Sequence, residues 1–162
     1  MAQKPLLVQV REIPLRYAIL PQAEIIPDPD SQYQLEDMLQ NTDIRNAFVP
    51  KEGFDYDSEI ETYWLRIHIQ ADRTPEQAWM LSIHKLIDYA ELYYPDAKGN
   101  YQKRKAGSLV PPQERERNLI PSNFRDFMHL HLSESKQTFY LKISSPTLLS
   151  RQFRAGERFF EL

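Results

Sequence analysis

The chain has 162 residues, a formal net charge of −3 at pH 7 and no cysteine, which excludes disulfides, thiol catalysis and thiolate metal sites. Hydrophobic residues make up 41% and aromatic residues 12%, a composition that excludes a disordered chain and, at this length, predicts one domain over residues 1–162 with a sizeable core. The negative charge argues against nucleic acid as a partner, because domains that bind phosphate backbones carry an excess of Lys and Arg.

The first 50 residues are expected to hold one strand and a short helical segment. Residues 4–11 have the apolar content of a strand, whereas the prolines after them allow only short extended pieces. In residues 31–40, SQYQLEDMLQ, apolar side chains recur at helical spacing, and Ser31 with Gln34 fits a capping box. No apolar run approaches the length of a membrane span, and the N-terminus lacks the pattern of a signal peptide.

Residues 51–162 are expected to carry the main strands. Two-residue alternation begins at Phe54 and continues through TYWLRIHIQ, residues 62–70. QAWMLSIH and LIDYAELYYP follow as strands, and the turn PDAKGN, which contains Gly99, joins LIDYAELYYP to YQKRKAG in a hairpin. DFMHLHLSE and TFYLKISSP are expected to form another pair of strands, and RQFRAGERFFEL a last one. Seven or more short strands with one early helix predict an all-β sandwich or barrel of Greek-key or jelly-roll type.

The alternation sorts the side chains of these strands into two sets, because successive residues of a strand point to opposite faces. The set expected to face the core is Leu65, Ile67, Ile69, Met128, Leu130, Leu132, Phe139, Leu141 and Ile143. The opposite set is aromatic and polar, and it comprises Trp64, Arg66, His68, Tyr89, Glu91, Tyr93, His129, His131, Tyr140 and Lys142.

A sheet face that mixes aromatic rings with fixed hydrogen-bond donors suits a sugar-like ligand, since sugars offer C–H faces for stacking and hydroxyls for hydrogen bonds. On this interpretation Trp64, Arg66 and His68 are the floor of a shallow ligand surface. The alternative is that Trp64 is covered by a loop or by the N-terminal helix, with the stem of Arg66 packed along it. The sequence leaves both interpretations open.

Other clusters give weaker signals for metal binding. His129 and His131 lie on one strand face, but no third ligand is evident, and no metal is predicted. DYDSE resembles the start of a calcium loop, yet Ile60 stands where that loop needs Gly, so an acidic solvent-facing row is expected. QERERN reads as a solvated loop from which Arg115 or Arg117 is able to reach back over a sheet face.

Catalysis finds little support in the sequence. It contains no G-x-S-x-G elbow, no Gly-rich phosphate loop and no H-E-x-x-H helix. A pair of carboxylates for glycoside hydrolysis remains open, because the separation of acidic side chains in space does not follow from their positions in the sequence. We therefore expect a protein that is not an enzyme and that uses no cofactor.

The order of several short stretches resembles a known family, the type 2 extracellular domain of bacterial seven-transmembrane receptors with diverse intracellular signalling modules (7TMR-DISM). The resemblance covers about the last two-thirds of the chain. The stretches that carry it are FVP (Phe48 to Pro50), YWLRIHI (Tyr63 to Ile69), IDYAELYYPDAKGNY (Ile87 to Tyr101), AGSLVPPQERER (Ala106 to Arg117) and FYLKISS (Phe139 to Ser145).

The resemblance implies a single periplasmic sensor domain with a jelly-roll β-sandwich similar to carbohydrate-binding modules. Residues 1–50 would supply an N-terminal strand and one short helix, and residues 51–162 the main sandwich strands. In such receptors the domain precedes a seven-helix membrane region and a cytoplasmic signalling module in the same full-length chain. The Trp-Leu-Arg motif of the family falls on Trp64, Leu65 and Arg66, and its Gly-to-Pro-to-Arg stretch on Gly107, Pro111 and Arg115.

The expected function is non-catalytic sensing of a carbohydrate or similar small polar ligand. The candidate ligand-binding residues are Trp64, Arg66, His68, Tyr93, Arg115, His129, His131 and Tyr140. The alternative is a protein-interaction or receptor-dimerisation module without a small-molecule ligand, because exposed aromatic and Arg side chains are also typical of protein interfaces. On that alternative the domain would form a homodimer.

Overall fold

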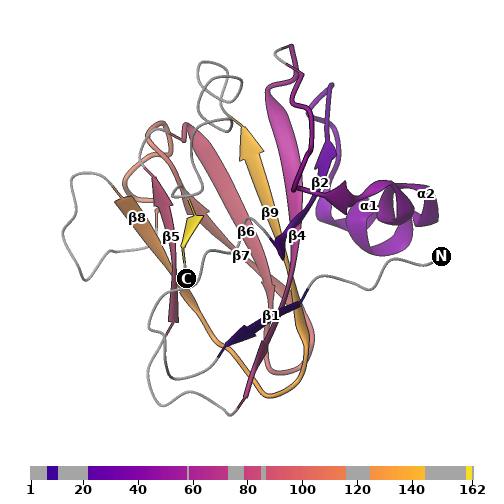
Figure 1. Ribbon diagram of the computed structural model, residues 1–162. Helices are drawn as coiled ribbons and strands as arrows, with labels where there is room; N and C mark the ends of the chain where they lie inside the picture. Colours follow the sequence, from indigo (N-terminus) through magenta and orange to yellow (C-terminus); the bar gives the residue numbers. More distant parts are fainter. Residues whose placement is uncertain are drawn as a thin grey trace.

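The computed structural model of the protein describes residues 7–10, 22–57, 59–72, 79–84, 87–115, 125–144 and 160–161. These residues form a β-sandwich of one large and one small sheet, with two short helices on the side of the large sheet away from the small one (Figure 1). The predicted all-β sandwich is therefore confirmed.

The large sheet has seven strands. Its order is β3 (Val49–Pro50), β2 (Glu24–Pro27), β4 (Thr62–Ala71), β9 (Gln137–Ser144), β6 (Tyr89–Pro95) and β7 (Tyr101–Ala106), and β1 (Leu7–Val10) also pairs with β4. The strands of this path are antiparallel to their neighbours, whereas β1 runs parallel to β4. β4 and β9 pair over eight residues and form the centre of the sheet.

The small sheet consists of β10 (Phe160–Glu161), β5 (Trp79–His84) and β8 (Arg125–Leu130), all antiparallel. Apolar side chains of both sheets meet in one core cluster, which contains all nine residues that the alternation assigned to the core. The predicted inward set is confirmed.

One strand pair agrees with the sequence prediction and another differs from it. β6 and β7 form the expected hairpin, and Gly99 takes a positive φ of +85° in its turn. β8 and β9, expected to be a pair, belong to different sheets, because β8 pairs with β5 while β9 lies between β4 and β6. The connection between them crosses from one layer of the sandwich to the other.

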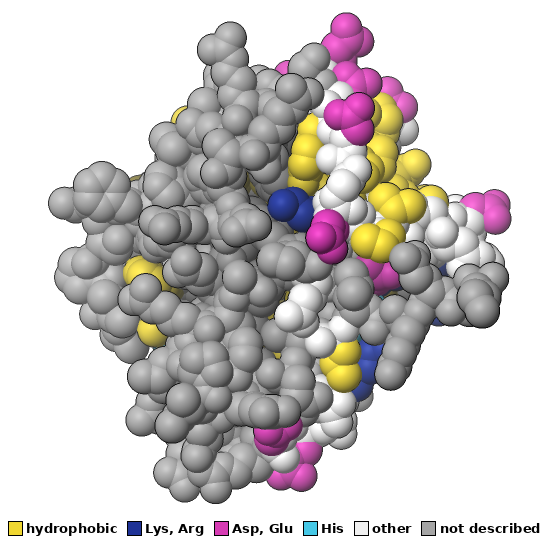
Figure 2. Space-filling model, in the orientation of Figure 1, with side chains coloured by type: hydrophobic (Ala, Val, Ile, Leu, Met, Phe, Trp, Pro, Cys, Tyr) yellow, Lys and Arg dark blue, Asp and Glu magenta, His cyan; other side chains and the backbone are white. Residues whose placement is uncertain are grey.

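Residues 54–57 and 59–61, before β4, form no strand, although their alternation resembled one. The rings of Phe54 and Tyr56 pack edge-on against each other and against Tyr63, with centroid separations of 5.0 to 6.0 Å. The alternation therefore reflects aromatic rings that close one end of the core, while the acidic residues between them face solvent as expected. Figure 2 shows Asp and Glu side chains gathered at the top of the molecule, where these residues lie.

The helical segment contains two helices, α1 (Leu35–Gln40) and α2 (Thr42–Ala47), rather than one. The predicted capping box of Ser31 and Gln34 is wrong: α1 begins after Gln34, whose backbone N–H donates to Asp37 Oδ2 at 2.8 Å. The side chain of Asn41 accepts from two backbone N–H groups at the start of α2. No helix among the described residues is long and apolar enough to cross a membrane.

Candidate functional site

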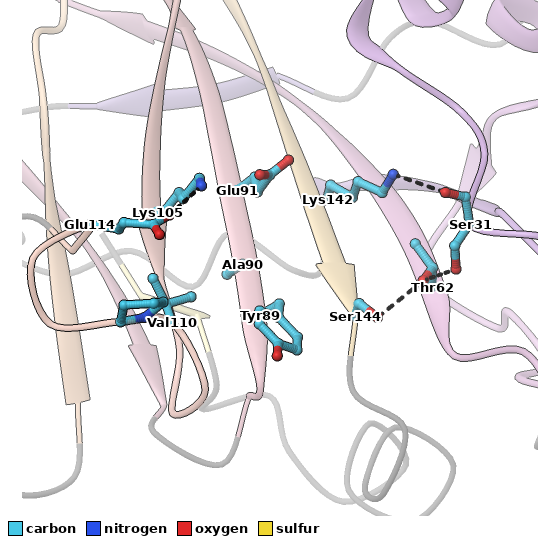
Figure 3. A pocket seen from close by; sticks show the side chains of 11 residues that line it. Ser31, Thr62, Tyr89, Ala90, Glu91, Lys105, Val110, Glu114, Lys142 and Ser144 are labelled. Atoms are coloured by element: carbon cyan, nitrogen blue, oxygen red, sulfur yellow. Dashed lines mark hydrogen bonds and ion pairs between the residues drawn. The ribbon is translucent and has the colours of Figure 1, made fainter.

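The outer face of the large sheet is divided into two halves. In the covered half, Trp64, Tyr93 and Tyr140 lie under α1 and α2 and form a second core cluster with side chains of the helical segment. In the open half, Thr62, Tyr89, Glu91, Lys105, Lys142 and Ser144 line a pocket (Figure 3). The same strands, β4, β9, β6 and β7, contribute to both halves.

Trp64 is the centre of the covered half and has no exposed surface. Its ring stacks on Tyr93 with the centroids 5.5 Å apart, and its Nε1–H donates to Asp28 Oδ2 at 3.2 Å. The expectation that the indole faces solvent is wrong, and the alternative of an indole covered by the N-terminal helical segment describes the structure. The physical reason is that the apolar side of this segment, including the fully buried Met38, needs a surface to pack against.

Arg66 attaches the helical segment to the sheet. Its Nε and Nη2 donate to the two carboxylate oxygens of Glu24 at 2.7 and 3.0 Å, and its Nη1 donates to the backbone oxygen of Arg45 in α2 at 2.9 Å. The guanidinium carbon lies 4.3 Å from the ring centroid of Phe48. Arg66 is thus committed to structural contacts.

His68 belongs to the same network as Glu24 and Arg66. Its Nδ1 lies 2.9 Å from Thr138 Oγ1, and its Nε2 lies 3.5 Å from Glu24 Oε2. Burial raises the pKa of the Glu24 carboxyl, but hydrogen bonds with His68 and Arg66 outweigh this effect and lower the pKa to about 2. Glu24 therefore holds its charge between two cationic or titratable partners.

The remaining candidates of the sequence prediction lie in three places. Tyr93 and Tyr140 are buried beside Trp64 in the covered half. His129 lies on β8 of the small sheet and His131 just beyond its end, so neither joins the Trp64 cluster. The described residues contain no group of three His, Asp or Glu side chains able to hold a metal ion. Arg115 lies in the loop after β7, and Arg117 lies outside the described residues.

The open half forms a pocket of about 340 Å³. Its floor includes Tyr89 and Glu91 on β6 and Lys142 on β9, and Figure 3 shows these side chains between two walls. Tyr89 is 44% exposed. Tyr89 therefore offers a flat apolar surface at the bottom of a hollow.

One wall of the pocket contains three hydroxyl groups that are hydrogen-bonded to one another, and the middle one, that of Thr62, is buried. Ser31 Oγ lies 2.6 Å from Thr62 Oγ1, which donates to Ser144 Oγ at 3.1 Å. Ser31 holds a positive φ of 55°, a conformation that costs a non-glycine residue roughly 1 kcal/mol. The backbone is fixed there by Asp28, whose carbonyl accepts from Ser31 N and whose carboxylate accepts from the next two backbone N–H groups.

Lys142 joins the two halves of the face. Its Nζ donates to the backbone oxygen of Tyr33 at 2.9 Å and lies 3.7 Å from Asp28 Oδ2. The same ammonium lies 5.2 Å from the ring centroid of Trp64. A side chain of the pocket is thereby in direct contact with the segment that leads into α1.

The opposite wall is the loop from Gly107 to Arg115. Gly107 has a φ of +123°, and a Cβ on it would lie 2.8 Å from the carbonyl carbon of Asp88, so this position requires glycine. Arg115 donates from Nε to the backbone oxygen of Val110 at 2.6 Å and from Nη2 to that of Ser108 at 2.9 Å. Arg115, a predicted ligand residue, holds this wall in place.

The charges in the pocket are balanced by pairs. Lys105 forms an ion pair with Glu114 at 2.6 Å, which raises the pKa of the lysine. Glu91 accepts from Tyr93 Oη at 2.7 Å and from Lys103 Nζ at 3.2 Å. Burial raises the pKa of Glu91, but the contacts with Tyr93 and Lys103 outweigh it and hold the pKa below its ordinary value.

The sequence prediction missed most of the pocket. Tyr89, Glu91 and Lys142 belonged to the outward set but were not selected as ligand residues. Ser31 and Val110 gave no signal, because they reach the pocket through loop conformation rather than through strand alternation.

The residues on which the two motifs of the resembled family fall frame this pocket. Trp64 and Arg66 hold the segment that supplies Ser31, and Gly107 and Arg115 shape the opposite loop. A search of curated proteins finds no match to the chain. Residues 20–155, well over half of the chain, match the family model described as 7TMR-DISM extracellular 2. The chain therefore belongs to the 7TMR-DISM extracellular 2 family, whose members are extracytoplasmic sensor-type domains of seven-transmembrane receptors.

Proposed function

We propose that this receptor domain senses a carbohydrate or a similar small polar ligand, which binds in the Tyr89 pocket without undergoing chemistry. The observation that carries the proposal is the exposed ring of Tyr89 at the floor of a hollow walled by hydroxyl groups. A sugar has both an apolar C–H face and a rim of hydroxyls, and this pocket offers a partner for each. Its volume of about 340 Å³ lies within the range of small-molecule sites, roughly 300–1,000 Å³.

The charge balance of the pocket supports an uncharged group at this place. Two lysines and two glutamates line it, and each has a protein partner of opposite charge or a backbone carbonyl. An ion entering the pocket would have to compete with these partners. A neutral polyol is able to hydrogen-bond to them without breaking the pairs.

The two glutamates of the pocket bear on the question of catalysis. A glycosidase needs one carboxyl that stays protonated near neutral pH as general acid and a second carboxylate opposite it. The pKa of Glu91 is shifted downward, away from that requirement, and Glu114 is in an ion pair with Lys105. This arrangement supports binding without bond cleavage.

The mechanism of sensing that we propose is a shift between two arrangements of the domain. A ligand changes such an equilibrium only if it binds one arrangement better than the other. Lys142 and Ser31 contact both the pocket and the segment that leads into α1, so a ligand that displaces either contact alters how the helices rest on the sheet. The helices are the part of the described structure through which a signal would pass.

The test is a calorimetric screen of the isolated domain against a panel of cell-wall and plant saccharides. We expect saturable binding of at least one saccharide, and roughly fivefold weaker binding by Tyr89→Ala, because one aromatic stacking contact contributes on the order of 1 kcal/mol. Leu109→Ala is the matched control, since Leu109 is also exposed but does not line the pocket. A panel without any binder, or an unchanged affinity in Tyr89→Ala, would contradict the proposal.

The alternative of a dimerisation or protein-interaction module is separated by the same variants. Tyr89 and Leu109 are both exposed, and a protein interface over this rim would use both side chains. Concentration-dependent dimerisation, measured by analytical ultracentrifugation and lost in both variants, would favour the alternative. Dimerisation unaffected by either variant would count against it at this face.

A further inference from the structure

A second cavity lies beside the Tyr89 pocket. We call it the basic groove; it has a volume of about 490 Å³ and is lined by Tyr94, Lys103, Arg104, Lys105, Glu114 and Arg115. Lys105 and Glu114 line both cavities. The two hollows are therefore neighbours, with the ion pair of Lys105 and Glu114 at their boundary.

The basic groove differs from the pocket in its charge. Four of its six lining residues are Lys or Arg and one is Glu, which gives a formal charge of +3 in a chain whose net charge is −3. Three of the cations are consecutive residues of β7, which ends the described path of the large sheet. Lysines on such a strand also discourage pairing with another sheet, which is the simpler explanation for their presence.

The geometry goes beyond what protection of an edge requires, because these cations are held in place. Lys103 and Lys105 each direct their ammonium to a glutamate, and the guanidinium of Arg104 lies 4.8 Å from the ring centroid of Tyr94. Arg115 comes from a different element and is fixed by two backbone carbonyls. An ammonium has three N–H donors, so a lysine that contacts one glutamate is able to donate to a second acceptor.

We propose that the pocket and the basic groove form one bipartite site for an acidic saccharide. The neutral ring of the ligand lies on Tyr89, and its anionic substituent lies in the groove among Lys103, Lys105 and Arg115, on the face of β7 that the pocket shares. The inference rests on the proposed function of the pocket, and it adds the charge of the ligand. The anion competes with Glu114 for Lys105, so binding loosens the ion pair between the two cavities.

The experiment compares saccharides in matched pairs that differ only in an anionic group. The pairs are glucuronate with glucose, galacturonate with galactose, N-acetylmuramate with N-acetylglucosamine, and glucose 6-phosphate with glucose. Each is titrated into the ¹⁵N-labelled domain, and the backbone amide shifts report both affinity and place. We expect the acidic member of at least one pair to bind at least tenfold more tightly and to shift amides of residues 103–105 and 115 as well as those around Tyr89.

Two controls test the electrostatic origin of the preference. Lys103→Gln is expected to reduce the affinity ratio of acidic to neutral member at least fivefold, whereas Lys98→Gln, which removes a lysine of the β6–β7 turn outside the groove, leaves that ratio unchanged. Added NaCl should weaken binding of the acidic member more than binding of the neutral one.

The outcomes separate this inference from the proposed function. If the neutral and acidic members of each pair bind equally well at Tyr89, the bipartite site is wrong, but the proposed sensing pocket is retained. Acidic members that bind more tightly without shifting residues 103–105 also overturn it. If no saccharide of either kind binds, the proposed function and the inference fail together.

Discussion

The covered and open halves of the large sheet's outer face both hold aromatic and cationic side chains, yet their aromatic residues differ in exposure to solvent. Trp64 in the covered half has no exposed surface, whereas Tyr89 in the open half is 44% exposed. Both lysines of the open half are engaged by protein groups, Lys142 by the backbone oxygen of Tyr33 and Lys105 by an ion pair with Glu114. The difference is that α1 and α2 pack over the covered half, whereas no residue of either helix lines the pocket in the open half.

The difference shows that an aromatic sheet face is not in itself a binding platform. A row of Trp, Tyr and Arg side chains is equally able to pack against a helix. The helix then buries the row, which becomes part of a second core. Only the residues beyond the edge of the cover remain available to a ligand. The contact of Lys142 with Tyr33 marks that edge in this protein.

The largest expected effect is a loss of stability when a side chain of the covered half is removed. Trp64→Ala should lower the free energy of unfolding by about 3–5 kcal/mol, because it empties a site that is fully buried against Tyr93. This loss is measured by urea denaturation that is monitored by far-ultraviolet circular dichroism, which reports on the backbone rather than on tryptophan. Trp64→Phe fills most of the volume and loses the bond to Asp28, so it should cost about 1–2 kcal/mol. A Trp64→Ala variant as stable as the wild type would mean that the cover is not packed as described.

The sandwich was predictable from the sequence, but the burial of Trp64 under the helices was not. Leu65, Ile67 and Ile69 alternate with polar residues, and the period of two identifies a core-facing row without any knowledge of the partner sheet. The same period places Trp64 on the outer face of the sheet, but it does not predict which part of the chain covers that face. That answer depends on the helical segment, whose docking is fixed by longer-range bonds such as that from Arg66 to the backbone oxygen of Arg45 in α2, 21 positions apart in the sequence.

The candidate site was predicted even less well, for a related reason. Arg115 was expected to reach over a sheet face, and it instead binds the carbonyls of its own loop, a local contact that alternation does not describe. Ser31 faces the pocket because of a positive φ, which no propensity of serine indicates. The rows of the strands were visible in the sequence, while the walls of the pocket, which are loops, were not.

The second prediction concerns how the covered half responds to acid. The pKa of Glu24 is about 2 in the folded protein and 4.5 in the unfolded chain, so folding favours the ionised carboxylate. Its contribution, on the order of 3 kcal/mol, is fully present above the unfolded pKa and is lost as the pH falls from about 4.5 to about 2. Glu24→Gln should remove this part of the pH dependence and lower stability at neutral pH by a similar amount.

The measurement is the free energy of unfolding of both proteins from pH 2 to pH 7. The two curves should converge toward the acid end, where the carboxylate of the wild type is protonated. Parallel curves over the whole range would show that Arg66 and His68 do not hold Glu24 in the ionised form.

The third prediction tests the loop wall of the open half. Gly107→Ala places a methyl group against the backbone of Asp88 at a φ of +123°, and it should cost about 2 kcal/mol. Gly99→Ala is the matched control, because Gly99 also has a positive φ but nothing lies within 4 Å of its Cβ position, so about 1 kcal/mol is expected. Equal losses in thermal denaturation would mean that the loop moves freely away from Asp88.

The smallest effect on stability is expected for Tyr89→Ala, the variant that should most impair ligand binding. Tyr89 has no part in either core cluster, and exposed substitutions usually change the free energy of unfolding by no more than about 0.5 kcal/mol. Trp64→Ala and Tyr89→Ala should thus give opposite profiles, one losing stability and the other losing affinity, as measured by urea denaturation and calorimetry on the same preparations. A large loss of stability in Tyr89→Ala would place this tyrosine with Trp64, as part of the scaffold, and leave the open half without its ligand surface.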